Sequence, residues 1–259
     1  MTDLVRFSFA LSPRMHAFLE LRDALLCLDE AKRQNHAYAW LHAATDIRSS
    51  LLGEQGRKPA VPEIIGLLVA MQTHLGKLAE EESPYRDSIQ GACDTIDQHI
   101  QTLRPGIPEA AKFLTNDALI CIYLNAQKKQ DWLGHKPTLP QSLTTMWQQG
   151  GPERATMLCE ALYQLEAIVN CLDSMLHDYV GWQSCIAENG SDQITPERGV
   201  NHGLIVIGLD TDSVARGIVP NISGNRLAIR LRFQSWQPGC PSADVEHDQA
   251  YAMMLVPVA

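Results

Sequence analysis

The stretch ISGNRLAIRLRF, residues 222–233, predicts a turn followed by a β-strand. Ser223-Gly224-Asn225 combines residue types that favour turns. Apolar and polar residues then alternate, with Leu227, Ile229, Leu231 and Phe233 set against Arg226, Ala228, Arg230 and Arg232. A period of two is typical of a strand with one buried face. We therefore expect Arg226, Arg230 and Arg232 to share the exposed face, above packed apolar residues.

Other alternating or apolar segments flank this strand. Residues 204–209 form a β-branched apolar run, which predicts a buried strand, and a last strand is expected near residues 251–256. At the other end of the chain Val5, Phe7, Phe9 and Leu11 alternate with smaller or charged residues. A single strand needs partners, so we expect one antiparallel sheet that includes both ends of the chain.

The residues between these ends show helical periodicity. Ser12-Pro13 is typical of a helix N-cap followed by proline at the first helical position. Helices are expected at residues 13–34, 36–52, from Pro62, at 84–103, from 116–117 and at 152–180. The last is apolar on most faces, which suits the centre of a bundle or a subunit interface. Residues 128–149 predict an irregular connection with one short helix, and residues 188–201 a linker or exposed loop.

This pattern predicts the α+β class, with a mainly α-helical bundle domain and a small antiparallel β-sheet domain. The expected boundaries are 12–187 for the helical domain, and 1–11 with 199–259 for the β domain.

Composition restricts the possible partners and compartments. The chain has 259 residues, 45% of them hydrophobic, and a net charge of -9. Nucleic acids and anionic membranes attract basic proteins, so neither is an expected partner. The first residues lack the apolar core of a signal peptide, and no apolar run is long enough to span a membrane, so the cytoplasm is expected. The seven cysteines are expected to be reduced core residues.

The sequence contains no motif that indicates an enzyme. It lacks GxSxG, GxxxxGK[ST], HExxH and GxGxxG, and no cofactor is expected. Asp173 and His177 lie four residues apart, which suits a side-chain pair on one helix face. A metal would need further ligands, and none is assigned. Four tryptophans are interpreted as core anchors in preference to interface hot spots: Trp132, Trp147, Trp182 and Trp236.

The arginine-rich strand lies in a local reversal of charge. Residues 213–243 contain no Asp or Glu, although the whole chain is acidic. The planar guanidinium of Arg binds carboxylates through two parallel hydrogen bonds. A docking surface for an acidic peptide is therefore one hypothesis. The alternative is a solvated sheet face whose arginines pair with acids such as Asp210, Asp244 or Glu246.

Four segments, in this order, resemble a known family. They are residues 7–22, which include LSPRMHAFLELR, residues 113–119, residues 158–176, and above all ISGNRLAIRLRF. The chain resembles ZapD, the Z-ring-associated protein D of bacterial cell division, over nearly its whole length. This resemblance implies a helical domain, a β domain and a homodimer without enzymatic activity. It also implies binding of the C-terminal tail of the tubulin-like protein FtsZ, bundling of FtsZ filaments, and a place at the division site.

The resemblance also suggests which residues bind the partner. Arg226 and Arg230 match pocket arginines of the family, and Arg232 is an additional positive charge on the expected face. Arg22 on the first helix is a further partner-binding candidate, although it is not the matching position.

The chain departs from the family pattern at other pocket positions. His16 and Glu20 stand where the family tends to have Arg on the first helix, and Ala118 stands where it tends to have another. A family His near Leu139-Pro140 has no clear counterpart. The alternatives are a divergent ZapD with a moved pocket, a same-fold adaptor with another partner, or an enzyme with an unrecognised site.

Overall fold

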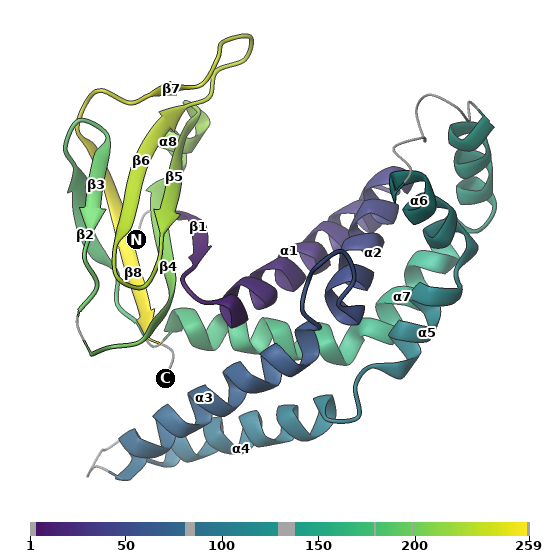
Figure 1. The fold of residues 1–259 in the computed structure, drawn as a ribbon, viewed down its shortest axis with the longest axis horizontal. Coiled ribbons are helices and arrows are strands. Elements are labelled where there is room, and N and C mark those ends of the chain that lie inside the picture. The colour runs from purple at the N-terminus through teal and green to yellow at the C-terminus, as the bar shows by residue number, and fades with distance from the viewer. Residues whose placement is uncertain (1–3, 81–85, 129–137, 179, 198, 258–259) are drawn as a thin grey trace. The chain divides into compact units, whose positions relative to one another are not determined.

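The computed structural model describes residues 4–80, 86–128, 138–178, 180–197 and 199–257. It confirms the α+β class (Figure 1). The chain divides into two compact units. We call them the β unit, formed by Met1–His16, Ala70–Ser83 and Asp173–Ala259, and the helical unit, formed by Ala17–Val69 and Pro84–Leu172.

The described helices begin and end close to the predicted positions in most cases. They are α1 Pro13–Arg33, α2 Ala37–Leu52, α3 Ala60–Glu80, α4 Arg86–Leu103, α5 Pro108–Asn116, α6 Ala118–Lys128, α7 Thr138–Asp178 and α8 Thr211–Ala215. As expected, Ser12 caps α1, because its Oγ accepts a hydrogen bond of 3.3 Å from the Met15 N–H. No helix in the described part of the chain is long and apolar enough to cross a membrane.

The prediction of an irregular connection over residues 128–149 is wrong in its second half. Helix α7 already begins at Thr138 and continues through Gly150, Gly151 and Pro152; residues 129–137 lie outside the described residues. The ring of Trp147 lies so close to Gly151 that a Cβ there would clash with it. Gly151 is therefore needed for packing, and this tertiary contact overrides its weak helix propensity.

Two tryptophans form the centre of the helical unit. Trp40 and Trp147 are almost fully buried, and their ring centroids are 5.2 Å apart. The indole Nε1–H of Trp147 donates a hydrogen bond of 3.0 Å to Asn35 Oδ1, which follows the end of α1. The interpretation of Trp147 as a core anchor is confirmed.

The strands form two antiparallel sheets in place of the single sheet predicted. The first sheet has the order β1-β4-β8-β2, and the second has the order β3-β6-β5, with β7 also paired to β6. Their bounds are β1 Leu4–Ala10, β2 Gln183–Ala187, β3 Ser191–Ile194, β4 His202–Asp210, β5 Ile218–Gly224, β6 Ile229–Ser235, β7 Ala243–Asp244 and β8 Gln249–Pro257.

The first sheet joins the two ends of the chain, as predicted. Strand β1 pairs with β4 so that Phe7 lies opposite Ile207, and β4 pairs with β8 so that Ile207 lies opposite Met253. The apolar residues that alternate along β1 consequently contribute to the core of the β unit.

The second sheet packs its apolar face against the first. Ile229, Leu231 and Phe233 of β6 are almost fully buried in one cluster with Ile207 and Met253. The alternation along β6 therefore has the predicted result, since one face of the strand is core. Residues 188–201, interpreted from the sequence as a linker or loop, contain β3, and strands begin at Gln183, before the expected boundary at residue 199.

Candidate partner-binding surface

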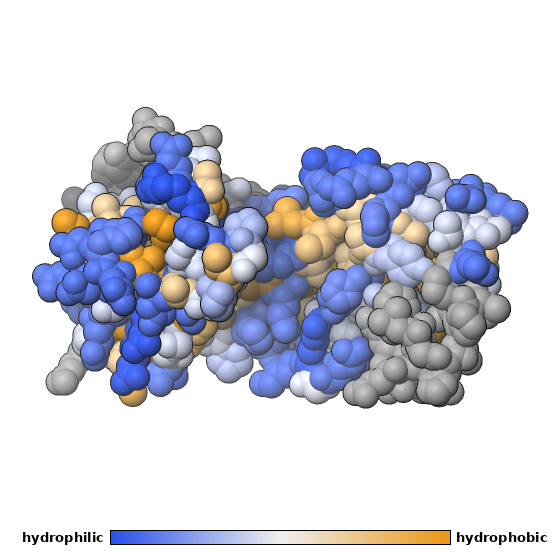
Figure 2. All heavy atoms as spheres, turned by 90° about the horizontal axis from the view of Figure 1, so that it is seen from above, coloured by the Kyte–Doolittle hydropathy of each residue, from blue (hydrophilic) through white to orange (hydrophobic). Residues whose placement is uncertain are grey.

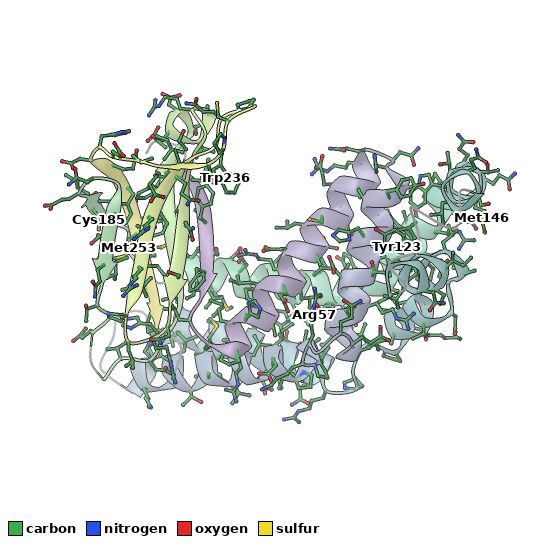
Figure 3. The ribbon with its side chains drawn as sticks, turned by 45° about the horizontal axis from the view of Figure 1, so that its top comes forward. Arg57, Tyr123, Met146, Cys185, Trp236 and Met253 are labelled. Carbon is green, nitrogen blue, oxygen red and sulfur yellow. The ribbon has the colours of Figure 1, made fainter. Side chains whose placement is uncertain are left out.

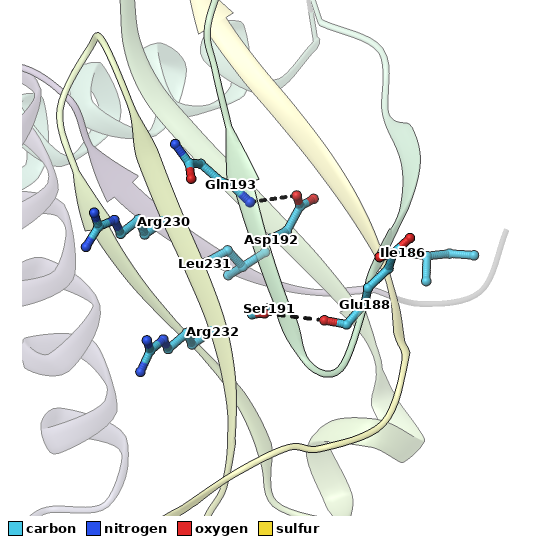
Figure 4. A pocket seen from close by; sticks show the side chains of 8 residues that line it. All are labelled: Ile186, Glu188, Ser191, Asp192, Gln193, Arg230, Leu231 and Arg232. Atoms are coloured by element: carbon cyan, nitrogen blue, oxygen red, sulfur yellow. Dashed lines mark hydrogen bonds between the residues drawn. The ribbon is translucent and has the colours of Figure 1, made fainter.

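Arg230 and Arg232 project from the exposed face of the second sheet (Figure 4). Both are exposed, while their neighbours Ile229, Leu231 and Phe233 are buried. The strand thus separates charge from core within seven residues. This confirms the predicted placement of two of the three arginines.

The residues beside these arginines are polar and uncharged. Residues directly opposite on paired strands share a face, so the register identifies them. Arg230 lies between Gln193 and Ser223, and Arg232 lies between Ser191 and Asn221. We call these six residues the arginine face: Ser191, Gln193, Asn221, Ser223, Arg230 and Arg232. Apart from the two cations, the arginine face offers only hydroxyl and amide groups, which can hydrogen-bond to a bound backbone.

The expected place of Arg226 on the same strand face is wrong. Arg226 lies in the loop between β5 and β6, where its Nη1 donates a hydrogen bond of 2.8 Å to Asn201 Oδ1. Leu227, expected beneath the arginines, is 81% exposed at the tip of the same hairpin. The Oδ1 of Asn225 accepts the Leu227 N–H at 2.8 Å, so this segment folds as a turn and the strand begins only at Ile229.

Arg22 belongs to the helical unit and not to the strand that carries the other candidates. Its Nη2 is 2.8 Å from the Asp23 carboxylate. Glu20, at a position where the resemblance implies an arginine, lies 3.8 Å from Arg57 Nε, and that guanidinium also contacts Asp46 at 3.3 Å. The Glu20 carboxylate thus has a partner within its own unit. Ala118 is the first residue of α6.

A hollow of about 450 Å³ is lined by residues of β2, β3 and β6 and of the β2–β3 turn (Figure 4). Arg230, Arg232, Ser191 and Gln193 line it, together with Ile186, Glu188, Asp192 and Leu231. The Asp192 carboxylate accepts a hydrogen bond of 2.6 Å from the Tyr251 hydroxyl, which ties β3 to β8. Burial and this bond raise the pKa of Tyr251. The hollow therefore has one wall fixed by this hydrogen bond, and both arginines and the two acids Glu188 and Asp192 line it.

Only one arginine of the face has a described acidic partner. Arg232 Nη1 lies 3.6 Å from Asp244 Oδ2 on β7, and both side chains are more than half exposed. Among the described residues Arg230 forms no ion pair. The alternative hypothesis, that the arginines pair with surface acids, therefore holds for Arg232, whose partner is Asp244. Asp210 instead caps α8: its carboxylate accepts hydrogen bonds from the Ser213 hydroxyl and the Ser213 N–H, and these bonds lower the pKa of the Asp210 carboxyl.

Trp236 was assigned to the core, but it is 60% exposed directly after β6 (Figure 3). The backbone N–H of Trp236 donates a hydrogen bond of 2.8 Å to the Gly217 carbonyl oxygen, which continues the pairing of β6 with β5. Trp182 is partly buried, and Trp132 lies outside the described residues. The signal for Trp236 was present in the sequence, because residues 230, 232, 234 and 236 have the same parity.

Asp173 and His177, the pair expected on one helix face, lie close together on α7. His177 Nδ1 lies 2.6 Å from the carbonyl oxygen of Asp173 and 3.7 Å from its carboxylate. The described residues contain no group of three His, Cys, Asp or Glu side chains arranged to hold a metal. The expectation of core cysteines is wrong, since Cys27 and Cys240 are exposed and the other five are only partly buried.

No protein-family model matches this chain, and a search of curated proteins finds no relative. The similarity to ZapD consequently rests on the four segments quoted above.

Proposed function

We propose that this protein is a non-enzymatic cell-division factor that binds the C-terminal tail of FtsZ and crosslinks FtsZ filaments. The observation that carries the proposal is the arginine face, where two exposed guanidinium groups stand on one strand among neutral polar side chains, with Asp244 on β7 as the one described acidic partner of Arg232. The resemblance to ZapD supplies the identity of the partner.

The chemistry of the arginine face suits an extended acidic peptide. Arg230 and Arg232 are two residues apart on a strand, so their side chains are separated by about 6.5 Å along it. Alternate residues of an extended peptide have the same spacing. Two carboxylates at alternate positions can therefore bind both guanidinium groups at once. Hydrogen bonds to charged groups typically contribute about 1.5–3 kcal/mol each, and less where water competes.

Crosslinking also requires two binding surfaces in one assembly. We propose a two-fold homodimer, which presents two equivalent arginine faces. Simultaneous binding along two polymers raises the apparent affinity of a weak single site by about 10²–10⁴. The helical unit offers apolar surface for such an interface, because Leu26, Met157 and Tyr163 are each at least half exposed. Figure 2 shows apolar residues gathered on one face of the helices.

A direct test measures the binding of a fluorescent peptide with the C-terminal tail sequence of FtsZ from the same organism. Changing both Arg230 and Arg232 to Glu is expected to weaken binding by about tenfold or more, because attraction becomes repulsion. Arg33→Glu is the matched control: Arg33 is 74% exposed and lies in the helical unit. Equal binding by the double variant and the wild-type protein contradicts the proposal.

A second candidate is a same-fold adaptor for another acidic partner. The observation that favours it is the pairing of Glu20 with Arg57, at a position where the resemblance implies an arginine. In that case the arginine face still binds acidic peptides, but the FtsZ tail has no advantage over a scrambled peptide of equal charge.

A further inference from the structure

The exposed side of strand β6 changes in character from one end to the other. Going towards its end, the outward positions are Arg230, Arg232, Gln234 and then Trp236. Gln234 lies opposite Val219, which is partly exposed on β5. Gln234 also lies opposite Asp244 on β7 and donates a hydrogen bond of 3.4 Å to its carboxylate. One end of the row is therefore cationic, and the Trp236 indole lies at the other end, beyond the Asp244 carboxylate.

The backbone holds Trp236 in register with the arginines. Ile218 lies opposite Ser235 in the β5–β6 pairing, so the next pair is Gly217 with Trp236. The hydrogen bond from the Trp236 N–H to Gly217 O confirms that the ladder continues to this point. Residue 236 then falls on the same face as residues 230, 232 and 234.

Most of the surface of Trp236 is uncovered in the described structure, where the residue is 60% exposed. Gly217, directly opposite, has no side chain to shield it, and a Cβ there would clash with the Trp236 carbonyl group. Exposed tryptophans are rare on solvated surfaces and common at the energetic centres of interfaces. A large exposed indole next to a cationic row matches the composition of such a centre.

We infer that Trp236 is an apolar anchor point of the same binding surface, and that the bound segment carries a large apolar side chain beyond its acidic residues. This inference rests on the proposed function of the arginine face. The spacing is fixed by the strand: Arg232 and Trp236 are four residues, or about 13 Å, apart. The partner is thus an extended peptide with carboxylates at alternate positions and an apolar side chain four residues further along.

The test uses two synthetic peptides that carry this spacing in opposite directions, ESESGSL and LSGSESE, with blocked ends. Binding to the full-length protein is followed by NMR, through the indole N–H signal of Trp236 and the backbone amides of β6. The Trp236 signal is assigned with Trp236→Phe. For one direction, we expect saturable binding that shifts the Trp236 indole signal and is about threefold to tenfold tighter than that of the peptide with Ser in place of Leu.

Variants separate the contribution of Trp236 from that of the arginines. Trp236→Ala is expected to abolish the difference between the Leu and Ser peptides while keeping the dependence on Glu, which is measured with Gln-substituted peptides. Leu227→Ser is the matched control, because Leu227 is the other exposed apolar side chain of this hairpin and lies beyond the opposite end of the arginine row. It is expected to leave the Leu preference unchanged.

The possible failures are distinguishable. Glu-dependent binding without any Leu preference overturns the inference and leaves the arginine face intact. A Leu preference that survives Trp236→Ala, or disappears in Leu227→Ser, also overturns it. Absence of binding by every peptide overturns both the inference and the proposed function.

Discussion

The guanidinium of Arg232 and the carboxylate of Asp244 lie 3.6 Å apart on neighbouring strands of the second sheet. Both side chains are more than half exposed, so the pair contributes little to stability. The pair affects binding, because the negative charge of Asp244 offsets part of the positive charge that would attract an acidic ligand.

Asp244→Asn is therefore expected to strengthen the binding of acidic peptides. Exposed ion pairs contribute about 0.2–1 kcal/mol, so the gain is about 1.5-fold to fivefold. Peptide titrations at low and at high salt check this, and the gain should shrink as salt screens the charges. Weaker binding by the Asn variant would mean that Asp244 positions Arg232 rather than competing for it.

The turn between β2 and β3 depends on Gly190. Its φ is +71°, and a Cβ there would overlap the carbonyl group of Val245. The Gly190 carbonyl oxygen also accepts a 2.8 Å hydrogen bond from the Phe233 N–H, which places the turn against β6. Gly190→Ala is expected to lower the free energy of unfolding of the β unit by about 2–4 kcal/mol, because it combines backbone strain with a clash.

Gly239 supplies the matched control for this substitution. Its φ is +77°, but no atom would lie within 4 Å of an added Cβ. Gly239→Ala should lower the free energy of unfolding only through the strain of a positive φ, by about 1 kcal/mol. Urea unfolding followed by circular dichroism compares the two variants, and equal losses would show that the contact with Val245 is unimportant.

The ionised carboxylate of Glu166 on α7 lowers the stability of the folded protein at neutral pH. Burial raises its pKa, and the nearby Asp29 raises it further. A carboxyl whose pKa is higher in the folded state costs stability above that pKa, and the cost disappears as the pH falls below the unfolded value of 4.5. Glu166→Gln should therefore stabilise the helical unit at pH 7 but not below pH 4.

This prediction is checked by measuring urea midpoints of both proteins across the pH range. Asp29→Asn is a second variant that should also raise stability at pH 7, by removing the neighbouring charge. A gain from Glu166→Gln that is the same at pH 7 and at pH 4 would contradict the electrostatic explanation.

Arg48 connects three helices of the helical unit. Its guanidinium contacts Glu54 Oε1 at 3.0 Å and donates a hydrogen bond of 3.1 Å to the carbonyl oxygen of Leu114 in α5. It also lies 3.7 Å from the Cys121 Sγ in α6. Its side chain is only 13% exposed, so its loss leaves poorly solvated groups without partners.

Arg48→Met is expected to reduce the free energy of unfolding by about 2–3 kcal/mol. Arg33→Met, at the exposed end of α1, should change it by less than about 0.5 kcal/mol. Chemical unfolding of the two variants compares these costs. A small effect at Arg48 would show that its hydrogen bonds are replaced by water.

The sequence predicts the pairing of the chain ends and the buried face of β6, because alternation is a local signal. It does not locate the first residue of β6, since Leu227 and Ile229 have the same parity and the turn ends between them. Strand β3, with the sequence SDQI, is polar and short, and it is stabilised by pairing with β6, far away in the sequence. The sequence predicts the start of the last long helix near Pro152, whereas α7 begins at Thr138, and the contact of Trp147 with Gly151 lies within it.

The candidate site was also predictable only in part from the sequence. Arg230 and Arg232 follow from alternation and from the absence of acids in residues 213–243. Trp236 follows from the same parity, but its aromatic character favoured a core assignment. The partner of Arg232 was one of three acids considered from the sequence, and only the register of β6 with β7 selects Asp244.

Sedimentation of FtsZ polymers with this protein tests whether the arginine face binds the FtsZ tail. FtsZ from the same organism is polymerised with GTP, with and without its C-terminal tail. We expect the wild-type protein to pellet with full-length FtsZ, and deletion of the tail or the change of Arg230 and Arg232 to Glu to abolish pelleting. Co-pelleting that persists with tail-deleted FtsZ, or no co-pelleting of the wild-type protein at all, would contradict this expectation.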